Sequence, residues 1–483
     1  MSRAVQRMAI GAGWVYAYRL GERLLDLVAI VVLARLLTPE DFGVVAIAAS
    51  VVTIIEGLSD FDVAKALIRS REDHRALFDT AWTLSALRGA AVALLMTLIA
   101  LLLPDRTIAL VVLVLAPGPL VKGLANPRFV TFERELVFSR LAWLTLGSRV
   151  LSFAVTLSLA VVYRSYWALV AGMLVGTLAS TLLSYALRPY RPRISLSRTR
   201  EIFAFSGWMS LMTMVTTLSM ETDKIIVGWL LGVSEAGLYF MTQRVGVLPT
   251  RELISPLQRI LFPSFSEIAH DRPRLRRVVV ESLNVLGSLS LPAGFGFALV
   301  AADVVPLALG ERWLPIVPLL AVLVPFLGVR ATVSMTVPCV MALGETRRLF
   351  QVSLVYAFIH VPAFVAGTWL FGLTGAIVSI VAAGVVYIAL SVWLLERTLE
   401  IRWRELLAPL RRPLGATGLM VAAVLAIGWV LREGLLPAAG AWSSLLTRVF
   451  AGAIVYSSAL YAMWRLEGRP PGIEQRLHQV SGR

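Results

Sequence analysis

Seven basic residues that can bind an anion lie within or at the edge of long apolar runs. They are Arg23, Arg88, Lys122, Arg149, Lys224, Arg244 and Arg330. A charge inside such a run is costly and usually faces a cavity or a partner. Arginine forks and lysine ammonium groups in a water-filled cavity bind phosphate oxygens, so the group favours an anionic headgroup over a cationic ligand. For any one residue, an ion pair between helices or snorkelling to a headgroup is the alternative interpretation.

Carboxylates in the same apolar runs are candidates for a proton or sodium site. We single out Glu22, Asp26, Glu221 and Asp223. Others in the same group are Glu56, Asp60 and Glu281. A carboxylate next to a lysine can instead be a permanently neutralised partner, as Asp223 can be for Lys224. The sequence therefore does not choose a coupling ion.

A polar seam runs through the apolar stretch 203–231. At about 100° per residue, a single narrow helical stripe contains Ser206, Ser210, Thr213, Thr217, Glu221 and Lys224. Lipid offers no partner for hydroxyls and charges, so we expect this stripe to line a transport cavity. A second charged face in the first apolar run consists of Arg19, Glu22, Arg23 and Asp26. That face can bound the same cavity, or its arginines can mark the cytoplasmic membrane boundary and pair with the neighbouring acids.

The sequence contains no pattern for covalent catalysis or metal binding. Its single cysteine, Cys339, excludes an internal disulfide, and its four histidines lie far apart. There is no Walker loop, HExxH or GxSxG pattern. We therefore predict no catalytic residue, no metal, no cofactor and no enzyme activity.

The composition predicts an integral membrane protein. Of the 483 residues, 58% are hydrophobic and 16% are charged, and the mean hydropathy is +0.78. Repeated apolar runs of about 20 residues are long enough to cross the hydrocarbon core as helices. The predicted spans are 9–36, 41–67, 77–103, 107–126, 138–162, 165–187, 203–231, 236–262, 278–302, 314–342, 349–371, 374–395, 413–431 and 443–464. The predicted fold class is therefore an all-α membrane protein with about 14 transmembrane helices.

The basic residues of the connections indicate the orientation in the membrane. With the N-terminus in the cytoplasm, the great majority of the loop arginines fall in cytoplasmic segments, as the positive-inside rule requires. Both termini are then predicted to be cytoplasmic. The formal charge of +15 is explained by these cytoplasmic arginines, so we do not predict nucleic acid as a partner.

Two long polar connections divide the predicted spans into six, six and a final pair. We predict an N-terminal six-helix bundle at 1–196 and a second six-helix bundle at 197–396. A connector, two further helices and a tail follow at 397–483. An internal repeat supports this division, because the pattern Leu-Leu, five residues, Gly at 36–43 recurs at 230–237. Six spans separate the copies, so the two bundles are predicted to be parallel repeats.

Seven short segments between about residues 10 and 400 carry a family resemblance. They are 34–43 (ARLLTPEDFG), 132–136 (FEREL), 166–170 (YWALV), 223–232 (DKIIVGWLLG), 237–239 (GLY), 261–264 (LFPS) and 309–313 (LGERW). In order and spacing they resemble the polysaccharide-transporter branch of the multidrug/oligosaccharidyl-lipid/polysaccharide (MOP) flippase superfamily. The resemblance implies two six-helix bundles around a central cavity, plus a C-terminal helix pair. It also implies that an undecaprenyl-pyrophosphate-linked oligosaccharide crosses the bacterial inner membrane by alternating access, for export of a surface polysaccharide such as lipopolysaccharide or exopolysaccharide.

The partners that this resemblance implies are a lipid-linked oligosaccharide, membrane lipids, and the polymerase and export machinery of the polysaccharide. The first alternative is a multidrug or cation antiporter of the same superfamily, which requires an acidic cavity rather than one rich in arginine. The second is a membrane polysaccharide polymerase or ligase. That enzyme requires a sizeable extracytoplasmic loop with catalytic arginines, whereas the loops on that side are short.

Overall fold

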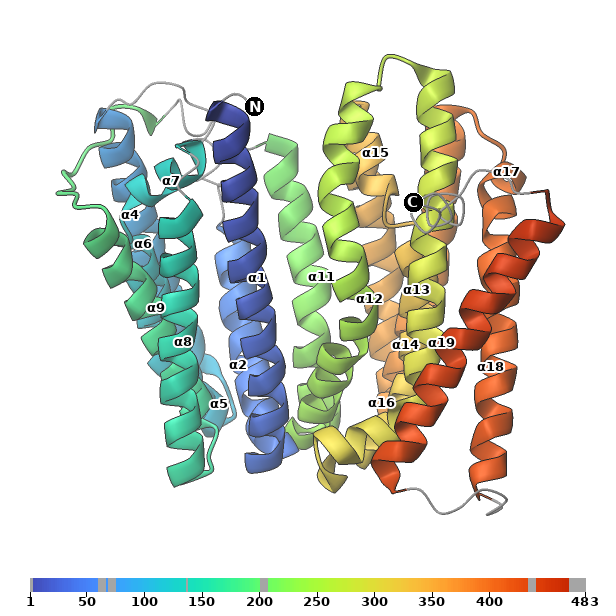
Figure 1. Cartoon of the computed structure of the whole chain (residues 1–483). Coiled ribbons are helices and arrows are strands. Elements are labelled where there is room, and N and C mark those ends of the chain that lie inside the picture. Colours follow the sequence, from blue (N-terminus) through green and yellow to red (C-terminus); the bar gives the residue numbers. More distant parts are fainter. Residues whose placement is uncertain are drawn as a thin grey trace. The chain divides into compact units, whose positions relative to one another are not determined.

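The computed structural model describes residues 3–59, 67, 75–135, 138–199, 207–432 and 440–468. Within these ranges the chain forms helices and no strands (Figure 1), which confirms the predicted all-α class. Ten of the described helices are long and apolar enough to cross a membrane. The chain forms two compact units, Met1–Gly237 and Leu238–Arg483. The division into repeats at residues 196 and 396 stays a prediction.

The first unit contains the helices up to α11 and the first turn of α12. Their bounds are α1 Arg3–Leu36, α2 Pro39–Leu58, α4 Arg75–Leu102, α5 Arg106–Leu115, α6 Pro117–Gly123, η1 Pro127–Val130, α7 Thr131–Arg134, α8 Phe138–Tyr163, α9 Trp167–Leu187 and α11 Gly207–Leu231. The second unit contains most of α12 Val233–Glu267, then α13 Arg272–Ala308, η2 Glu311–Ile316, α14 Val317–Thr332, α15 Thr336–Ala342, α16 Thr346–Leu399, α17 Trp403–Leu407, η3 Ala408–Leu410, α18 Arg411–Arg432 and α19 Ala441–Leu466.

Each of the apolar runs predicted from the sequence falls on one to three of the described helices. The first, seventh and eighth runs fall on α1, α11 and α12, which are not among the ten helices just mentioned. The runs at 349–371 and 374–395 both belong to α16, which breaks at Gly372 because a φ of 62° there leaves the helical conformation. Glycine tolerates that angle because it has no Cβ atom. The count of fourteen transmembrane helices stays a prediction.

Glycines bring α4 and α6 into backbone contact. A Cβ atom added to Gly89 of α4 would lie 2.5 Å from the carbonyl oxygen of Pro119. A Cβ atom added to Gly123 of α6 would lie 2.3 Å from the carbonyl oxygen of Ser85. Small residues are the usual means of close helix packing in membranes, because helices there associate by close contact rather than by exclusion of water.

The contact between α8 and α9 is equally close. A Cβ atom added to Gly172 of α9 would lie only 1.7 Å from the Thr156 hydroxyl oxygen of α8. One turn later, a Cβ atom on Gly176 would approach Ser152 to 3.1 Å. The two glycines are four residues apart, so both lie on the helix face that packs against α8.

The two copies of the sequence repeat contact each other through equivalent atoms. A Cβ atom on Gly43 would lie 1.9 Å from the carbonyl oxygen of Val233, and one on Gly237 would lie 1.8 Å from that of Pro39. Residues 39 and 43 occupy the same places in the first copy as residues 233 and 237 do in the second. Such a reciprocal contact is what a twofold axis between duplicated segments produces.

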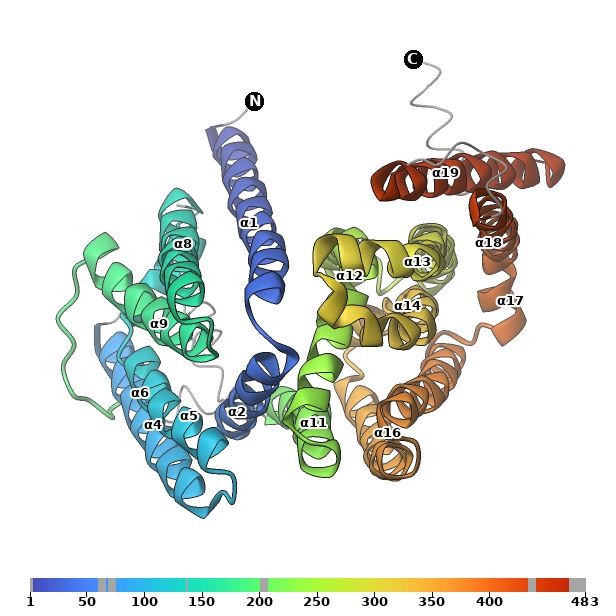
Figure 2. The same ribbon diagram turned by 90° about the horizontal axis from the view of Figure 1, so that it is seen from below.

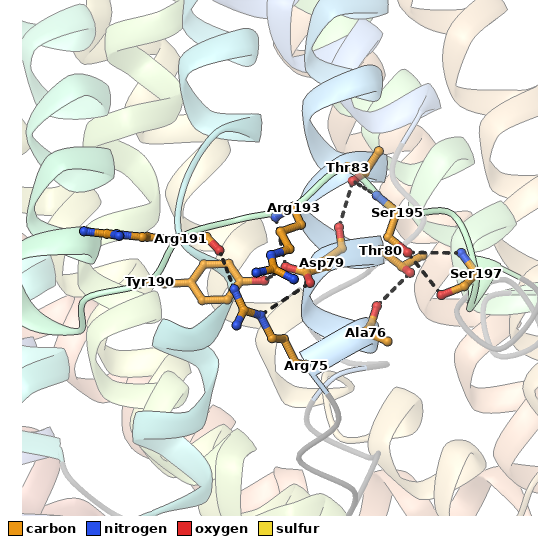
Figure 3. Close-up of polar contacts among 10 residues, drawn as sticks. All are labelled: Arg75, Ala76, Asp79, Thr80, Thr83, Tyr190, Arg191, Arg193, Ser195 and Ser197. Carbon is orange, nitrogen blue, oxygen red and sulfur yellow. Dashed lines mark hydrogen bonds and ion pairs between the residues drawn. The ribbon is translucent and has the colours of Figure 1, made fainter.

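The segment between α9 and α11 is held against the first turns of α4 (Figure 3). The buried Asp79 carboxylate accepts hydrogen bonds from the Tyr190 hydroxyl and from the Arg193 backbone N–H. Thr83 accepts a further hydrogen bond, of 3.0 Å, from the Ser195 backbone N–H. Burial and, next, the bond to Asp79 raise the pKa of Tyr190 above its ordinary value of 10, so the phenol remains a donor at neutral pH.

The second unit is organised around α13, which packs against α14, while α18 and α19 lie side by side (Figure 2). A Cβ atom on Gly294 of α13 would lie 2.8 Å from the carbonyl oxygen of Val324 of α14. Asp303 of α13 and Arg448 of α19 form an ion pair that ties the last helix to this core. The final helix pair is therefore joined to its own unit by both packing and charge.

Candidate functional site

A cavity of about 890 Å³ lies inside the first unit, among α2, α4, α6, α8, α9 and α11. Its lining combines basic side chains with many hydroxyl groups and several glycines. The polar residues of the lining are Thr53, Glu56, Ser85, Arg88, Lys122, Ser148, Arg149, Ser152, Thr177, Ser180, Thr181 and Thr217. Ligand sites in proteins typically have volumes of about 300 to 1,000 Å³, so the cavity can hold a ligand with several functional groups.

Basic side chains outnumber acidic ones in the lining of the cavity. Three of the seven basic residues predicted from the sequence line it, namely Arg88, Lys122 and Arg149. Of the described lining residues, Glu56 is the one carboxylate. The formal charges of this described lining therefore leave an excess of two positive charges. An anion would be attracted to this space and a cation repelled from it.

The packing of α4 on α6 brings two of these cations to the cavity, because Arg88 and Lys122 each immediately precede a glycine of that contact. The Lys122 ammonium group donates to the Glu56 carboxylate at 2.8 Å. The Arg88 guanidinium donates to the Glu56 carbonyl oxygen at 2.7 Å and to the Ser59 hydroxyl at 3.1 Å. These acceptors lie at the C-terminal end of α2, where helix carbonyls lack helical partners and a cation is favourable. Arg88 is thus fixed, while Lys122 is held by one carboxylate.

Arg149 of α8 supplies the third cation. Its guanidinium lies 3.4 Å from the Asp26 carboxylate of α1. Asp26 belongs to the charged face that was predicted in the first apolar run, so part of that face lies next to the cavity. The side chains of Arg149 and Lys122 are 56% and 66% exposed, so each can reach a ligand despite its ion pair. Exposed ion pairs are weak, so little free energy is lost when either basic residue exchanges its carboxylate partner for an anionic ligand.

The polar seam of α11 contributes one described residue, Thr217, to the lining. Lys224 instead forms an ion pair of 2.6 Å with Glu221, which also accepts a 2.8 Å hydrogen bond from Ser50 of α2. Ser206 lies outside the described residues, as do the side chains of Ser210 and Thr213. For Lys224 the structure therefore supports the alternative interpretation, an internal ion pair.

The other predicted site residues are not among the residues of this lining. On α1, Arg23 and Glu22 are half-buried, and Asp223 of α11 is buried. Arg244 on α12 and Arg330 on α14 belong to the second unit, where Arg330 lies over the ring of Tyr387 at 5.2 Å. Glu281 lies in the second unit as well, and Asp60 is outside the described residues.

The hydroxyl groups of α8 and α9 are the part of the lining that the sequence analysis missed. Ser148 and Ser152 lie one turn apart on α8, and Thr177, Ser180 and Thr181 are spaced by three and four on α9. That spacing indicates one polar face on each helix. The signal was available, but serine and threonine are common in membrane helices and carry no charge that would single them out.

No cluster of three or more histidine, cysteine, aspartate or glutamate side chains suited to a metal ion is found in the described ranges. The lining offers ammonium, guanidinium, carboxylate and hydroxyl groups. Such a set can bind and orient an anionic, hydroxyl-rich molecule.

Residues 32–318 match the profile of a family described as polysaccharide biosynthesis protein. The lipopolysaccharide biosynthesis protein WzxC of Escherichia coli (strain K12) is 26% identical over 386 residues, which cover 76% of each chain. The succinoglycan biosynthesis transport protein ExoT of Rhizobium meliloti (strain 1021) is 27% identical over 358 residues, which cover 71% of each chain.

Two solved structures share the fold. The lipid II flippase MurJ in an inward closed conformation gives a TM-score of 0.72 at 12% identity, covering 93% of this chain and 98% of its own. An inward-facing multidrug resistance MATE family transporter of the MOP superfamily gives a TM-score of 0.62 at 16% identity, covering 78% of this chain and 95% of its own. At these identities the similarity concerns the fold alone.

Proposed function

Because the chain belongs to the family of polysaccharide biosynthesis proteins, we propose that it is a flippase that moves a lipid-linked oligosaccharide across the bacterial inner membrane. The proposed substrate carries an undecaprenyl-pyrophosphate anchor and passes from the inner to the outer leaflet by alternating access. The proposed protein is a transporter rather than an enzyme, with both termini in the cytoplasm. The polymerase and export machinery of a surface polysaccharide would take over its product.

The charge of the cavity is the observation that carries this proposal. A diphosphate that links a lipid to a sugar has about two negative charges, and arginine and lysine are the side chains that bind phosphate oxygens best. The described lining has an excess of two positive charges. A cationic drug would meet like charges in the same place, so the charge argues against a cation antiporter.

The ion pairs of the cavity suggest how the diphosphate is bound. Glu56 neutralises Lys122 at 2.8 Å, and the lysine side chain is 66% exposed. A diphosphate oxygen can take the place of the Glu56 carboxylate, and Lys122 then exchanges one anionic partner for another. Arg88 needs no such exchange, because it is anchored on the end of α2 and presents a fixed positive charge.

Neutralisation of Arg149 tests this function without breaking the helix contacts near Arg88 and Lys122. In a bacterium whose surface polysaccharide depends on this chain, we expect Arg149→Gln to reduce export about fivefold, since an exposed charged contact contributes up to about 1 kcal/mol. The measurement is the amount of polysaccharide at the cell surface per molecule of protein in the membrane. Arg106→Gln is the control, because Arg106 is an exposed arginine of the same unit that does not line the cavity. Equal export by the two variants would contradict the assignment.

A further inference from the structure

Four of the five hydroxyl groups that α8 and α9 contribute to the cavity have their protons engaged. Ser148 donates to the carbonyl oxygen of Thr145 at 3.0 Å, one turn earlier in α8. Thr177 donates to the carbonyl oxygen of Met173 at 3.0 Å, one turn earlier in α9. Both bonds lie within one helix, so they form wherever the helix forms.

Two more hydroxyls of the cavity donate their protons across helix contacts. Ser152 of α8 donates to the carbonyl oxygen of Gly172 of α9 at 2.7 Å. Thr181 of α9 donates to the carbonyl oxygen of Val121 of α6 at 3.0 Å. The first of these contacts has no room for a Cβ atom at Gly172, so the helix packing fixes the direction in which the hydroxyl points.

A hydroxyl group has one proton and two lone pairs. Because the proton is already given to a carbonyl oxygen, each of these groups offers a ligand its lone pairs. We call the set the acceptor wall, and it consists of Ser148, Ser152, Thr177 and Thr181. A ligand that touches the acceptor wall must therefore donate hydrogen bonds to it.

The basic residues of the same cavity have the opposite character. Arg88, Lys122 and Arg149 donate hydrogen bonds and cannot accept them. They are carried by α4, α6 and by the turn of α8 that also bears Ser148. One end of a suitable ligand therefore accepts hydrogen bonds and is anionic, and the other end is rich in O–H or N–H groups. A glycosyl diphosphate has this arrangement.

We propose that the acceptor wall recognises the sugar that is joined to the diphosphate, by accepting hydrogen bonds from its hydroxyl and amide groups. This inference rests on the proposed function and adds the specificity of the site. It assigns the diphosphate to the basic residues and the first sugar to the hydroxyl groups of the acceptor wall. With the basic residues engaged by the diphosphate, the wall selects a neutral, hydroxyl-rich sugar over a uronic acid, because a carboxylate offers it only lone pairs and no proton.

The test uses three probes with the same lipid. They are farnesyl diphosphate, its glucosyl diester and its glucuronosyl diester. Their dissociation constants are measured by calorimetry on the purified, full-length protein in nanodiscs. We expect the glucosyl probe to bind at least about 10-fold more tightly than farnesyl diphosphate, with several hydrogen bonds contributing, each a factor of about 2 to 10. The glucuronosyl probe should lose most of this gain.

Two variants test whether the acceptor wall is responsible for the tighter binding of the glucosyl probe. Thr177→Val keeps the shape of the side chain, and Ser148→Ala removes a hydroxyl bonded only within its own helix. Each should lower the affinity for the glucosyl probe about 3-fold and leave that for farnesyl diphosphate unchanged. Thr97→Val is the matched control, because Thr97 of α4 makes the same kind of bond, to the Ala93 carbonyl, outside the cavity lining.

The outcomes separate this inference from the proposed function. Tight binding of farnesyl diphosphate with no gain from glucose would overturn the inference and leave the proposed function standing. A gain that survives in both wall variants, or that is as large for the glucuronosyl probe, would also overturn it. If none of the three probes binds, the diphosphate site itself is refuted, and the proposed function fails with it.

Discussion

Export of surface polysaccharide is expected to be nearly abolished when Lys122 is replaced by glutamate. The substitution removes an ammonium group that can bind the diphosphate and puts a carboxylate opposite Glu56, so the described lining loses its excess of positive charge. The lost attraction of an exposed charge contributes up to about 1 kcal/mol, and the repulsion from the new carboxylate adds about the same, which together correspond to about 30-fold weaker binding. The measurement is surface polysaccharide in a strain that depends on this chain, normalised to the protein in the membrane.

A charge swap provides the matched control for this experiment. Glu56→Lys combined with Lys122→Glu restores both the ion pair and the net charge of the lining. We expect the double variant to recover export to within about tenfold of the unchanged protein, because the field in the cavity depends on the sum of its charges. Normal export by the single Lys122→Glu variant would refute the role of the basic residues.

The second large effect is expected at the contact of the two repeat copies. A side chain at Gly43 would start 1.9 Å from the carbonyl oxygen of Val233, and neither backbone can yield without separating α2 from the start of α12. Overpacking of a close contact costs about 1 to 3 kcal/mol when side chains can adjust, and more when only backbone lies opposite. We therefore expect Gly43→Leu to leave little folded protein, measured as the monodisperse fraction in fluorescence-detected size-exclusion chromatography.

Gly418→Leu is the control for that substitution. Gly418 lies inside helix α18, and a Cβ atom there would meet nothing within 4 Å. The same leucine should therefore be tolerated at this position. If Gly43→Leu and Gly418→Leu give equal amounts of folded protein, the close contact of the repeat copies does not matter for assembly.

The fold class follows from the sequence because the bilayer imposes a length and a polarity on each helix. Apolar runs therefore predicted where the helices lie. They also separated the runs 349–371 and 374–395 at the place where α16 leaves the helical conformation, at Gly372. They did not show that α11 belongs to the compact first unit, because tertiary contacts decide that.

The candidate site was predicted in part. Arg88 and Lys122 were predicted as site residues because a charge in an apolar run is energetically costly. Only the structure shows that the glycines that follow them bring the two side chains to the same cavity. Lys224 illustrates how adjacency in the sequence misleads, whereas helical spacing had placed it on one stripe with Glu221. Its neighbour Asp223 was the carboxylate considered as its partner, whereas the structure pairs it with Glu221, because residues three apart on a helix face each other and adjacent ones do not.

The most direct test of the cationic cavity is whether a lipid diphosphate occupies it. The chain has one cysteine, the buried Cys339, so Cys339→Ala with Ser180→Cys places a single reactive thiol in the lining. The measurement is the rate at which a water-soluble maleimide labels this variant, purified and full-length. We predict that saturating farnesyl diphosphate slows labelling at least about fivefold while farnesol leaves it unchanged. An unchanged rate with farnesyl diphosphate, or equal slowing by farnesol, would contradict a cavity that binds the diphosphate.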